Sequence, residues 1–209
     1  MVSKNGCFIV FEGIDGSGKS TQISLLKDHI EEHSINCMTT MEPSNGPIGT
    51  LLRQFLSGRI KGEETTLTAL FAADRLDHLN NPVNGICKLL EDGIAVISDR
   101  YVFSNYAYQS VSVPLEWIMK CNEMANETVR PDCHIFIDVS PETAMDRVSK
   151  GRHQTDIYET LDRLTDVRER YLDLIHRMED VENIIIIDGN RPEKEIADDI
   201  WAKVCHYFV

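Results

Sequence analysis

Eight residues from Gly13 to Ser20 read GIDGSGKS, directly after a short apolar run and directly before a segment with helical periodicity. This spacing matches G-x-x-x-x-G-K-[ST], the P-loop pattern, whose glycines let successive backbone N–H groups turn toward a phosphate. The helix that follows directs the positive end of its dipole at the same anion. The pattern predicts that ATP phosphates bind to Gly13, Ile14, Asp15, Gly16, Ser17, Gly18, Lys19, Ser20 and Thr21.

Charged and hydroxyl side chains at and near this loop suit phosphoryl transfer. Lys19 would reach the β- and γ-phosphates, and the Ser20 hydroxyl would be a ligand of Mg²⁺. Asp99 ends the apolar run AVIS, and ligands bind at the carboxyl ends of strands in open parallel sheets, so we expect it near the metal. Arg100 would supply positive charge where two phosphates meet, although an ion pair between Asp99 and Arg100 would also explain both residues.

The rest of the sequence narrows the class of P-loop protein. A GTPase carries a guanine-reading N-K-x-D, and the sequence contains none. In motor and transporter ATPases the metal-binding strand usually ends in Asp-Glu, whereas here AVIS is followed by Asp99-Arg100-Tyr101. These differences favour a phosphotransferase over a GTPase or a motor protein.

The elements that must position these residues alternate between strand and helix. Apolar runs without in-and-out alternation are typical of parallel strands covered on both faces, and they predict strands at 7–12, 36–41, 94–99, 133–139 and 183–188. Helical periodicity predicts helices at 20–33, 66–91 with an interruption at 80–82, 114–127, 141–149, 161–179 and 192–207. The alternation predicts an α/β protein of three layers, the P-loop NTPase fold, with a five-stranded parallel sheet flanked by helices.

Length, charge and composition limit the organisation and the partners. The 209 residues suit one domain, residues 1–209, and 42% hydrophobic residues can form a sizeable core. The formal net charge of −13 repels nucleic-acid backbones and anionic lipids, so we expect neither polymeric nucleic acid nor a membrane as a partner. No apolar run reaches membrane-spanning length, and the six scattered cysteines suit buried thiols, so we expect a soluble cytoplasmic protein.

One segment, residues 150–159 (KGRHQTDIYE), is polar, contains glycine and lacks an apolar helical stripe. It lies between two predicted helices, where a lid of about residues 150–160 would lie. A solvated connector explains the same composition.

Several motifs, in order along the chain, resemble those of the thymidylate kinase family. They are Glu12 with GIDGSGKST, Glu42-Pro43, Phe71-Ala72-Ala73-Asp74-Arg75, Asp99-Arg100-Tyr101, Ala107-Tyr108-Gln109, Arg130-Pro131-Asp132 and Asp138-Val139-Ser140-Pro141-Glu142. The resemblance extends from about Phe8 to Asn190. It implies a nucleoside monophosphate kinase that transfers the γ-phosphoryl group of ATP to dTMP, with Mg²⁺ and without a covalent intermediate. It also implies a homodimer.

The resemblance further implies roles for single residues. Asp15 would face the 3′-hydroxyl of the acceptor sugar, Arg100 would hold the acceptor phosphate, and Tyr108 would crowd the 2′ position. Thymine would be contacted by Phe71, by stacking, and by Arg75, Asn105 and Gln109, through hydrogen bonds. Periodicity alone gives Phe71 another explanation, since LTALFAA also suits a buried helix face.

Gly16 indicates where a further positive charge comes from. One subgroup of the family has a P-loop arginine there, and the other has glycine and supplies the charge from the lid. Gly16 therefore makes Arg152, with Arg147 at the foot of the lid, the candidate to grip the ATP phosphates. Arg191 follows the last predicted strand, where the adenine pocket closes in these folds, although a turn before a helix explains it equally well. Met41 replaces an arginine common in the family, and it is assigned no role.

Two other interpretations stay open at this point. A sister kinase of the same fold would act on another pyrimidine nucleotide or on a deoxynucleoside, whose neutral hydroxyl needs a base, and Glu12 could be read as that base. A non-catalytic nucleotide-binding module would keep the fold alone. The intact set of Lys19, Ser20, Asp99 and Arg100 disfavours it.

Overall fold

The computed structural model of this chain describes residues 5–151 and 160–208. Its strands are β1 (Phe8–Glu12), β2 (Cys37–Met41), β3 (Ala95–Asp99), β4 (Cys133–Asp138) and β5 (Ile184–Asp188). They form one five-stranded sheet in the order β2-β3-β1-β4-β5, and every neighbouring pair is parallel. The predicted five-stranded parallel sheet is confirmed. All five residues of β1 are buried, as the apolar run FIVF requires of a central strand covered on both faces.

The helices mostly agree with the predicted ones. Two helices were not predicted: α5 is buried over all eight of its residues and therefore has no apolar stripe, and α2 is a short amphipathic helix that begins at a proline. The interruption predicted at 80–82 within the helical segment 66–91 is confirmed, since α3 ends at Asn80 and α4 begins at Ile86. The helices of the described residues are α1 (Lys19–Glu32), α2 (Pro47–Leu56), α3 (Glu64–Asn80), α4 (Ile86–Glu91), α5 (Val102–Gln109), α6 (Leu115–Thr128), α7 (Pro141–Gly151), α8 (Leu161–Met178) and α9 (Glu193–Val204).

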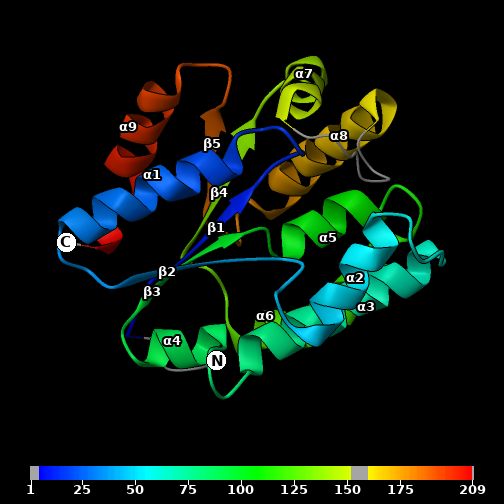
Figure 1. The fold of residues 1–209 in the computed structure, drawn as a ribbon, viewed down its shortest axis with the longest axis horizontal. Helices are drawn as coiled ribbons and strands as arrows, with labels where there is room; N and C mark the ends of the chain where they lie inside the picture. Colours follow the sequence, from blue (N-terminus) through cyan, green and yellow to red (C-terminus); the bar gives the residue numbers. More distant parts are fainter. Residues whose placement is uncertain (1–4, 152–159, 209) are drawn as a thin grey trace.

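The sheet separates two apolar cores, which makes three layers (Figure 1). The smaller core joins one face of the sheet to α1 and α9, through residues such as Ile23, Leu26 and Ile200. The larger core lies on the other face and includes side chains of α4, α5, α6 and α8. Because helices cover both faces of the sheet, polar side chains can gather only where the strands end.

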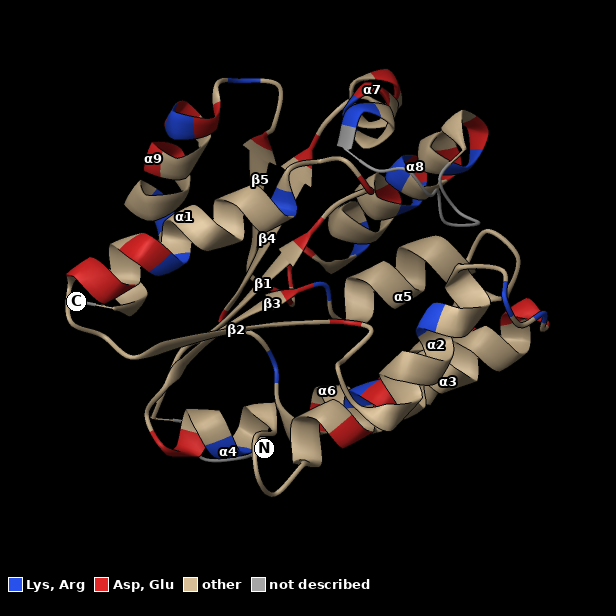
Figure 2. Ribbon diagram, in the orientation of Figure 1, with Lys and Arg blue, Asp and Glu red and all other residues tan. Residues whose placement is uncertain are grey.

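The strand register brings three strand ends to one edge. Asp99 is opposite Phe11 of β1 and opposite Met41 of β2, so the segments that follow all three strands start side by side. Figure 2 shows charged residues on the outer helices and at the strand ends, while the strands themselves are mostly uncharged. The loop after β1 therefore faces Asp99 and Arg100 directly.

The state of the cysteines and the lengths of the helices bear on the expectations drawn from composition. All six cysteines are free thiols, and three of them, Cys37, Cys87 and Cys133, are buried. In the part of the chain that the structure describes, no helix has the length and apolar character needed to cross a membrane.

Candidate active site

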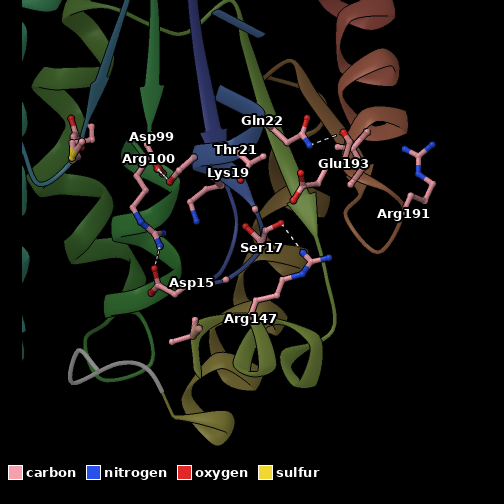
Figure 3. A pocket seen from close by; sticks show the side chains of 17 residues that line it. Asp15, Ser17, Lys19, Thr21, Gln22, Asp99, Arg100, Arg147, Arg191 and Glu193 are labelled. Atoms are coloured by element: carbon pink, nitrogen blue, oxygen red, sulfur yellow. Dashed lines mark hydrogen bonds and ion pairs between the residues drawn. The ribbon is translucent and has the colours of Figure 1, made fainter. Parts of the chain in front are cut away.

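The P-loop opens onto a cavity of about 690 Å³ (Figure 3). Gly18 precedes α1 with a φ of 98°, a left-handed conformation that glycine adopts without steric cost, and no side chain caps the helix. The first N–H groups of α1 are therefore directed at the cavity, which is the usual arrangement for binding an anion. Residues 15–22 line one wall, and the opposite walls include Met41, Asp99, Arg100, Arg147 and Arg191.

Packing against α7 explains why residue 16 is a glycine. Its φ is +81°, and a Cβ atom there would lie 2.3 Å from the carbonyl oxygen of Ala144 in α7. Glycine is therefore the residue that fits this backbone contact. α7 instead contributes Arg147, which donates to Ser17 O at 3.3 Å and to Gly189 O at 3.0 Å. A guanidinium group thus lies against the loop that lacks its own arginine.

Lys19 is almost wholly buried beneath the loop. Its Nζ donates to the carbonyl oxygens of Gly13 at 3.0 Å and Ile14 at 3.1 Å. Burial and the nearby Arg100 charge lower the pKa of Lys19 to about 8, and Asp99 and Asp15 offset this only in part. The ammonium therefore lacks a full counter-charge, which an incoming phosphate would provide.

Arg100 joins the P-loop to α5. Its backbone has a φ of 77°, unusual for a residue with a Cβ, and its N–H donates to Phe11 O at 2.9 Å. The guanidinium donates to Asp15 Oδ1 at 2.6 Å, Ser104 Oγ at 3.0 Å and Gly13 O at 3.1 Å. The ion pair considered from the sequence, Asp99 with Arg100, is replaced by one between Asp15 and Arg100.

Asp15 is held as a carboxylate that can only accept hydrogen bonds. Burial raises its pKa, but the charges of Arg100 and Lys19 outweigh burial and leave the pKa at about 2. The Tyr108 hydroxyl donates to Asp15 Oδ2 at 2.9 Å and accepts from the Asp15 backbone N–H at 3.1 Å. Asp15, Arg100 and Tyr108 are therefore one hydrogen-bonded group at the edge of the cavity.

Glu12 supports this group from below. It is fully buried, and burial raises its pKa although three donors and Arg100 oppose the shift. Its carboxylate accepts from Tyr101 N at 3.0 Å, Ser104 Oγ at 2.6 Å and the Tyr171 hydroxyl at 2.9 Å. Ser104 also accepts from Arg100, so Glu12 acts on Arg100 through that hydroxyl. A group with this burial and these partners is a support for Arg100 and is poorly placed to deprotonate a substrate hydroxyl.

Two side chains fit a Mg²⁺ ion completed by nucleotide phosphates. Ser20 Oγ donates to Asp99 Oδ2 at 3.1 Å, so the hydroxyl and the carboxylate meet across the cavity wall. Asp99 Oδ1 is buried and has no hydrogen-bond partner among the described residues, so it is available to a further ligand. The described residues hold no cluster of three His, Cys, Asp or Glu side chains for a metal. Mg²⁺ commonly takes only one or two protein ligands and substrate phosphates, so the pair is sufficient.

The residues expected to contact a base lie on α3 and α5, away from the cavity wall. Phe71 is half-buried and belongs to neither apolar core of the described residues. Packing in a core therefore does not explain why an aromatic residue occupies this position. Arg75 is 1% exposed and donates through Nε to Glu42 Oε2 at 2.9 Å. Asn105 and Gln109 are buried one turn apart, with Asn105 Nδ2 donating to Gln109 Oε1 at 3.0 Å.

Some of the remaining predicted site residues line the cavity, and one lies outside the described residues. Thr21 lines the cavity together with residues 15–20, whereas Gly13 and Ile14 of the predicted loop are not in its wall and Ile14 is buried in the core. Arg191 lines it on the far side from Lys19 and donates to Asp199 Oδ2 at 2.7 Å (Figure 3). Met41 is half-exposed at the cavity wall. Arg152 and most of the predicted lid lie outside the described residues.

Two residues of the site, Ser104 and Asn122, escaped the sequence reasoning, and the support that Glu12 gives to Arg100 was not predicted. Ser104 lies four positions after Arg100, and Asn122 interrupts the buried positions Ile118 and Ala125 of α6. Each is a polar residue where the apolar pattern expects none. Polar groups at such positions are retained when buried partners satisfy them.

The comparisons with known proteins all identify the same family. The family model described as thymidylate kinase matches residues 11–200. A probable thymidylate kinase of Methanobrevibacter smithii is 37% identical over 206 residues, which cover 96% of this chain and 95% of the relative. A thymidylate kinase of Symbiobacterium thermophilum is 36% identical over 202 residues, which cover 92% of this chain and 90% of the relative.

Proposed function

The chain belongs to the thymidylate kinase family, and we infer that it transfers the γ-phosphoryl group of ATP to dTMP, giving dTDP and ADP in nucleotide biosynthesis. The observation that carries the mechanism is the position of Arg100, whose guanidinium contacts Gly13 O and Asp15 of the P-loop and Ser104 of α5. A single guanidinium between two phosphate sites can neutralise the charge that develops as they approach.

On the donor side, we propose that the P-loop N–H groups and Lys19 bind the ATP phosphates, with Arg147 beside them. Binding would draw the Lys19 ammonium toward phosphate oxygens, because its present partners are two neutral carbonyl groups. Arg191 would contribute at the adenine end, since it lines the far wall of the cavity. The role of Arg152, expected from the sequence as a lid arginine, stays a prediction.

When bound at Ser20 and Asp99, Mg²⁺ would neutralise phosphate charge and help to orient the donor. Asp99 Oδ1 is free to accept a ligand there, since it has no hydrogen-bond partner within the described part of the chain. The other charges around the reacting phosphates belong to the chain itself.

On the acceptor side, we propose that Arg100 holds the dTMP phosphate while Asp15 accepts the hydrogen bond of the sugar 3′-hydroxyl. The low pKa of Asp15 suits this role, because a carboxylate that stays ionised always presents acceptor oxygens. The Cζ atom of Arg100 lies 4.9 Å from the centroid of the Tyr108 ring, and Tyr108 would crowd the 2′ position of the sugar. Phe71, Arg75, Asn105 and Gln109 would recognise the base.

The reaction needs no general base in this arrangement. A phosphate acceptor is already ionised, so the transfer depends on alignment and on charge neutralisation. Glu12, the carboxyl group that the sequence offered as a possible base, is buried behind Ser104 and Tyr171. This favours a nucleotide over a nucleoside as the acceptor.

An acceptor panel tests the function. Release of ADP is measured with dTMP, dUMP, UMP and thymidine at equal concentrations, with ATP and Mg²⁺ present. We expect dTMP to give the highest kcat/KM and thymidine to give no turnover. Use of thymidine without use of dTMP would show a deoxynucleoside kinase, and binding of ATP without use of any acceptor would show a non-catalytic module.

The pKa of Lys19 predicts proton uptake on ATP binding. The pKa is about 8 in the free enzyme, and phosphate charge raises it, so an enzyme that is partly deprotonated must take up a proton. We expect an uptake of about half a proton near pH 8 and almost none near pH 6, with ATP affinity falling as the pH rises through about 8. Calorimetry in buffers of different ionisation enthalpy measures this uptake.

The Lys19→Met variant is the control for that measurement. ATP itself titrates near neutral pH, and the variant retains this contribution while lacking the lysine. Equal proton uptake by the variant and the wild type near pH 8 would assign the proton to another group.

We also propose that residues 1–209 form one kinase domain that acts as a homodimer in the cytoplasm, without nucleic-acid or membrane partners. α6 presents Trp117 and Met124 on one outward face, at 40% and 65% exposure. A second copy of this chain would bury these side chains. Sedimentation of Trp117→Asp is expected to give a monomer where the wild type gives a dimer, and a wild-type monomer would contradict the proposal.

A further inference from the structure

A line of buried polar side chains connects three helices beneath the proposed base site. Arg75 of α3 donates through Nη1 to Asn122 Oδ1 of α6, and Asn122 Nδ2 donates to Asn105 Oδ1 of α5 at 2.8 Å. Asn105 Nδ2 then donates to Gln109 Oε1 at 3.0 Å. All four side chains are at most 2% exposed, so water does not substitute for these bonds.

The chemistry of the first member fixes the direction of the whole line. A guanidinium group donates hydrogen bonds and accepts none, so the atom of Asn122 that meets Arg75 must be its oxygen. The Asn122 amide nitrogen is then committed to Asn105 Oδ1 and, at 2.8 Å, to the backbone oxygen of Ile118. Asn105 must therefore direct its oxygen at Asn122 and its nitrogen at Gln109.

Asn122 keeps Asn105 from turning over. If the Asn105 amide rotated by half a turn, its NH₂ group would face the NH₂ group of Asn122, and two buried donors would lose their acceptors. Buried donors without partners are costly, so one orientation is strongly favoured. A base bound beside Asn105 would therefore meet a fixed arrangement of donors and acceptors instead of one that adapts to the base.

We propose that Asn122 is a positioning residue for acceptor recognition: it holds Arg75 and Asn105 in the one arrangement that selects a 4-keto, N3–H pyrimidine over a 4-amino pyrimidine. The inference rests on the proposed base site. Thymine and cytosine present opposite hydrogen-bonding groups at ring positions 3 and 4, so a fixed arrangement that matches one base opposes the other. Asn122 itself need not touch the nucleotide.

The Asn122→Asp variant tests this directly. A carboxylate still accepts from Arg75 but cannot donate to Asn105, so the Asn105 amide becomes free to turn over. We expect KM for dTMP to rise about tenfold and KM for ATP to stay unchanged. The ratio of the dissociation constants for dCMP and dTMP, measured by calorimetry, is expected to fall about tenfold.

The same helix offers a matched control in Asn126. Its Nδ2 donates to the Tyr106 hydroxyl at 2.9 Å, one turn away from Asn122 and outside the polar line. Asn126→Asp introduces the same charge and is expected to change the unfolding midpoint while leaving the dCMP-to-dTMP ratio at its wild-type value. The same fall in both variants would overturn the proposal, because it would be an effect of charge in α6.

Double variants separate this proposal from the proposed base site. In an Asn105→Ala background, adding Asn122→Asp is expected to cause no further change in the ratio, since the amide that it positions is gone. An Asn105→Ala variant with wild-type KM for dTMP would remove the base site itself. If Asn105→Ala raises that KM and Asn122→Asp leaves the ratio unchanged, only the role of Asn122 is overturned. Should the buried carboxylate prevent folding, Asn122→Ser loosens the same constraint without charge and is judged by the same ratio.

Discussion

Replacing Lys19 by methionine is expected to lower kcat by about 10³-fold, near the upper end of what the loss of one charge-stabilising donor costs. Methionine has a similar length and removes the ammonium alone. Lys19 is the buried cation at the centre of the loop, and its two carbonyl partners leave its charge available to a phosphate. Steady-state kinetics with saturating dTMP and ATP measure the effect.

The stability of the same variant should move in the opposite direction from its activity. Burial and Arg100 hold the pKa of Lys19 below its ordinary value, so the charged form is less favourable in the folded chain than in the unfolded chain. Below pH 8 this is a cost to folding, and removing the charge removes the cost. We expect the Tm of Lys19→Met to equal or exceed that of the wild type.

Lys27 supplies the control on the same helix. Its ammonium is exposed and pairs with Glu31 at 3.4 Å, outside the cavity. Lys27→Met is expected to retain wild-type kcat. A loss of activity in Lys19→Met that comes with a large fall in Tm would indicate a collapsed loop and would count against the role of the ammonium.

Replacing Arg100 by lysine is expected to lower kcat/KM for dTMP by about 10² to 10³-fold, while KM for ATP changes only a few-fold. The guanidinium holds Asp15, Ser104 and Gly13 O at once, and an ammonium cannot reproduce that planar set of donors. Lysine has the same Cβ as arginine at the left-handed backbone of this position, so the comparison isolates the head group.

A second arginine with a planar ion pair provides the comparison for Arg100. Arg168 of α8 donates through Nε and Nη2 to the two carboxylate oxygens of Asp138, at 2.7 and 2.8 Å. Arg168→Lys is expected to affect Tm more than KM for dTMP. If Arg100→Lys raises the KM values for ATP and dTMP equally, Arg100 belongs to the loop as a whole and not to the acceptor phosphate.

Local sequence patterns predicted the strands of this fold and most of its helices. Short runs rich in apolar or β-branched residues predict all five parallel strands, and the P-loop spacing predicts the phosphate site at the end of the first. These signals are local, since period and spacing are read within about ten to twenty residues. The pattern does not predict α5, because this helix is buried on all sides and therefore has no apolar stripe. The motif Asp99-Arg100-Tyr101 directly before it is visible in the sequence.

Side-chain partners were decided by the tertiary structure. Asp15 and Arg100 are 85 positions apart in the chain and Glu12 and Tyr171 are 159 apart, so no local pattern connects them. The sequence suggested Asp99 as the partner of Arg100, because they are neighbours, and the parallel register instead directs Asp99 to Ser20. Adjacent residues at a strand end point in different directions, which sequence adjacency does not convey.

Gly16 illustrates the difference between what the sequence determines and what only the folded structure determines. The sequence alone determined that the P-loop lacks an arginine there, and the family resemblance implied that the lid supplies a positive charge in its place. Only the packing of α7 shows why glycine is needed, with the Ala144 carbonyl where a Cβ would lie, and it brings Arg147 to Ser17 O. The residue types that do chemistry are therefore legible in the sequence, while their partners and orientations depend on distant segments that meet only when the chain is folded.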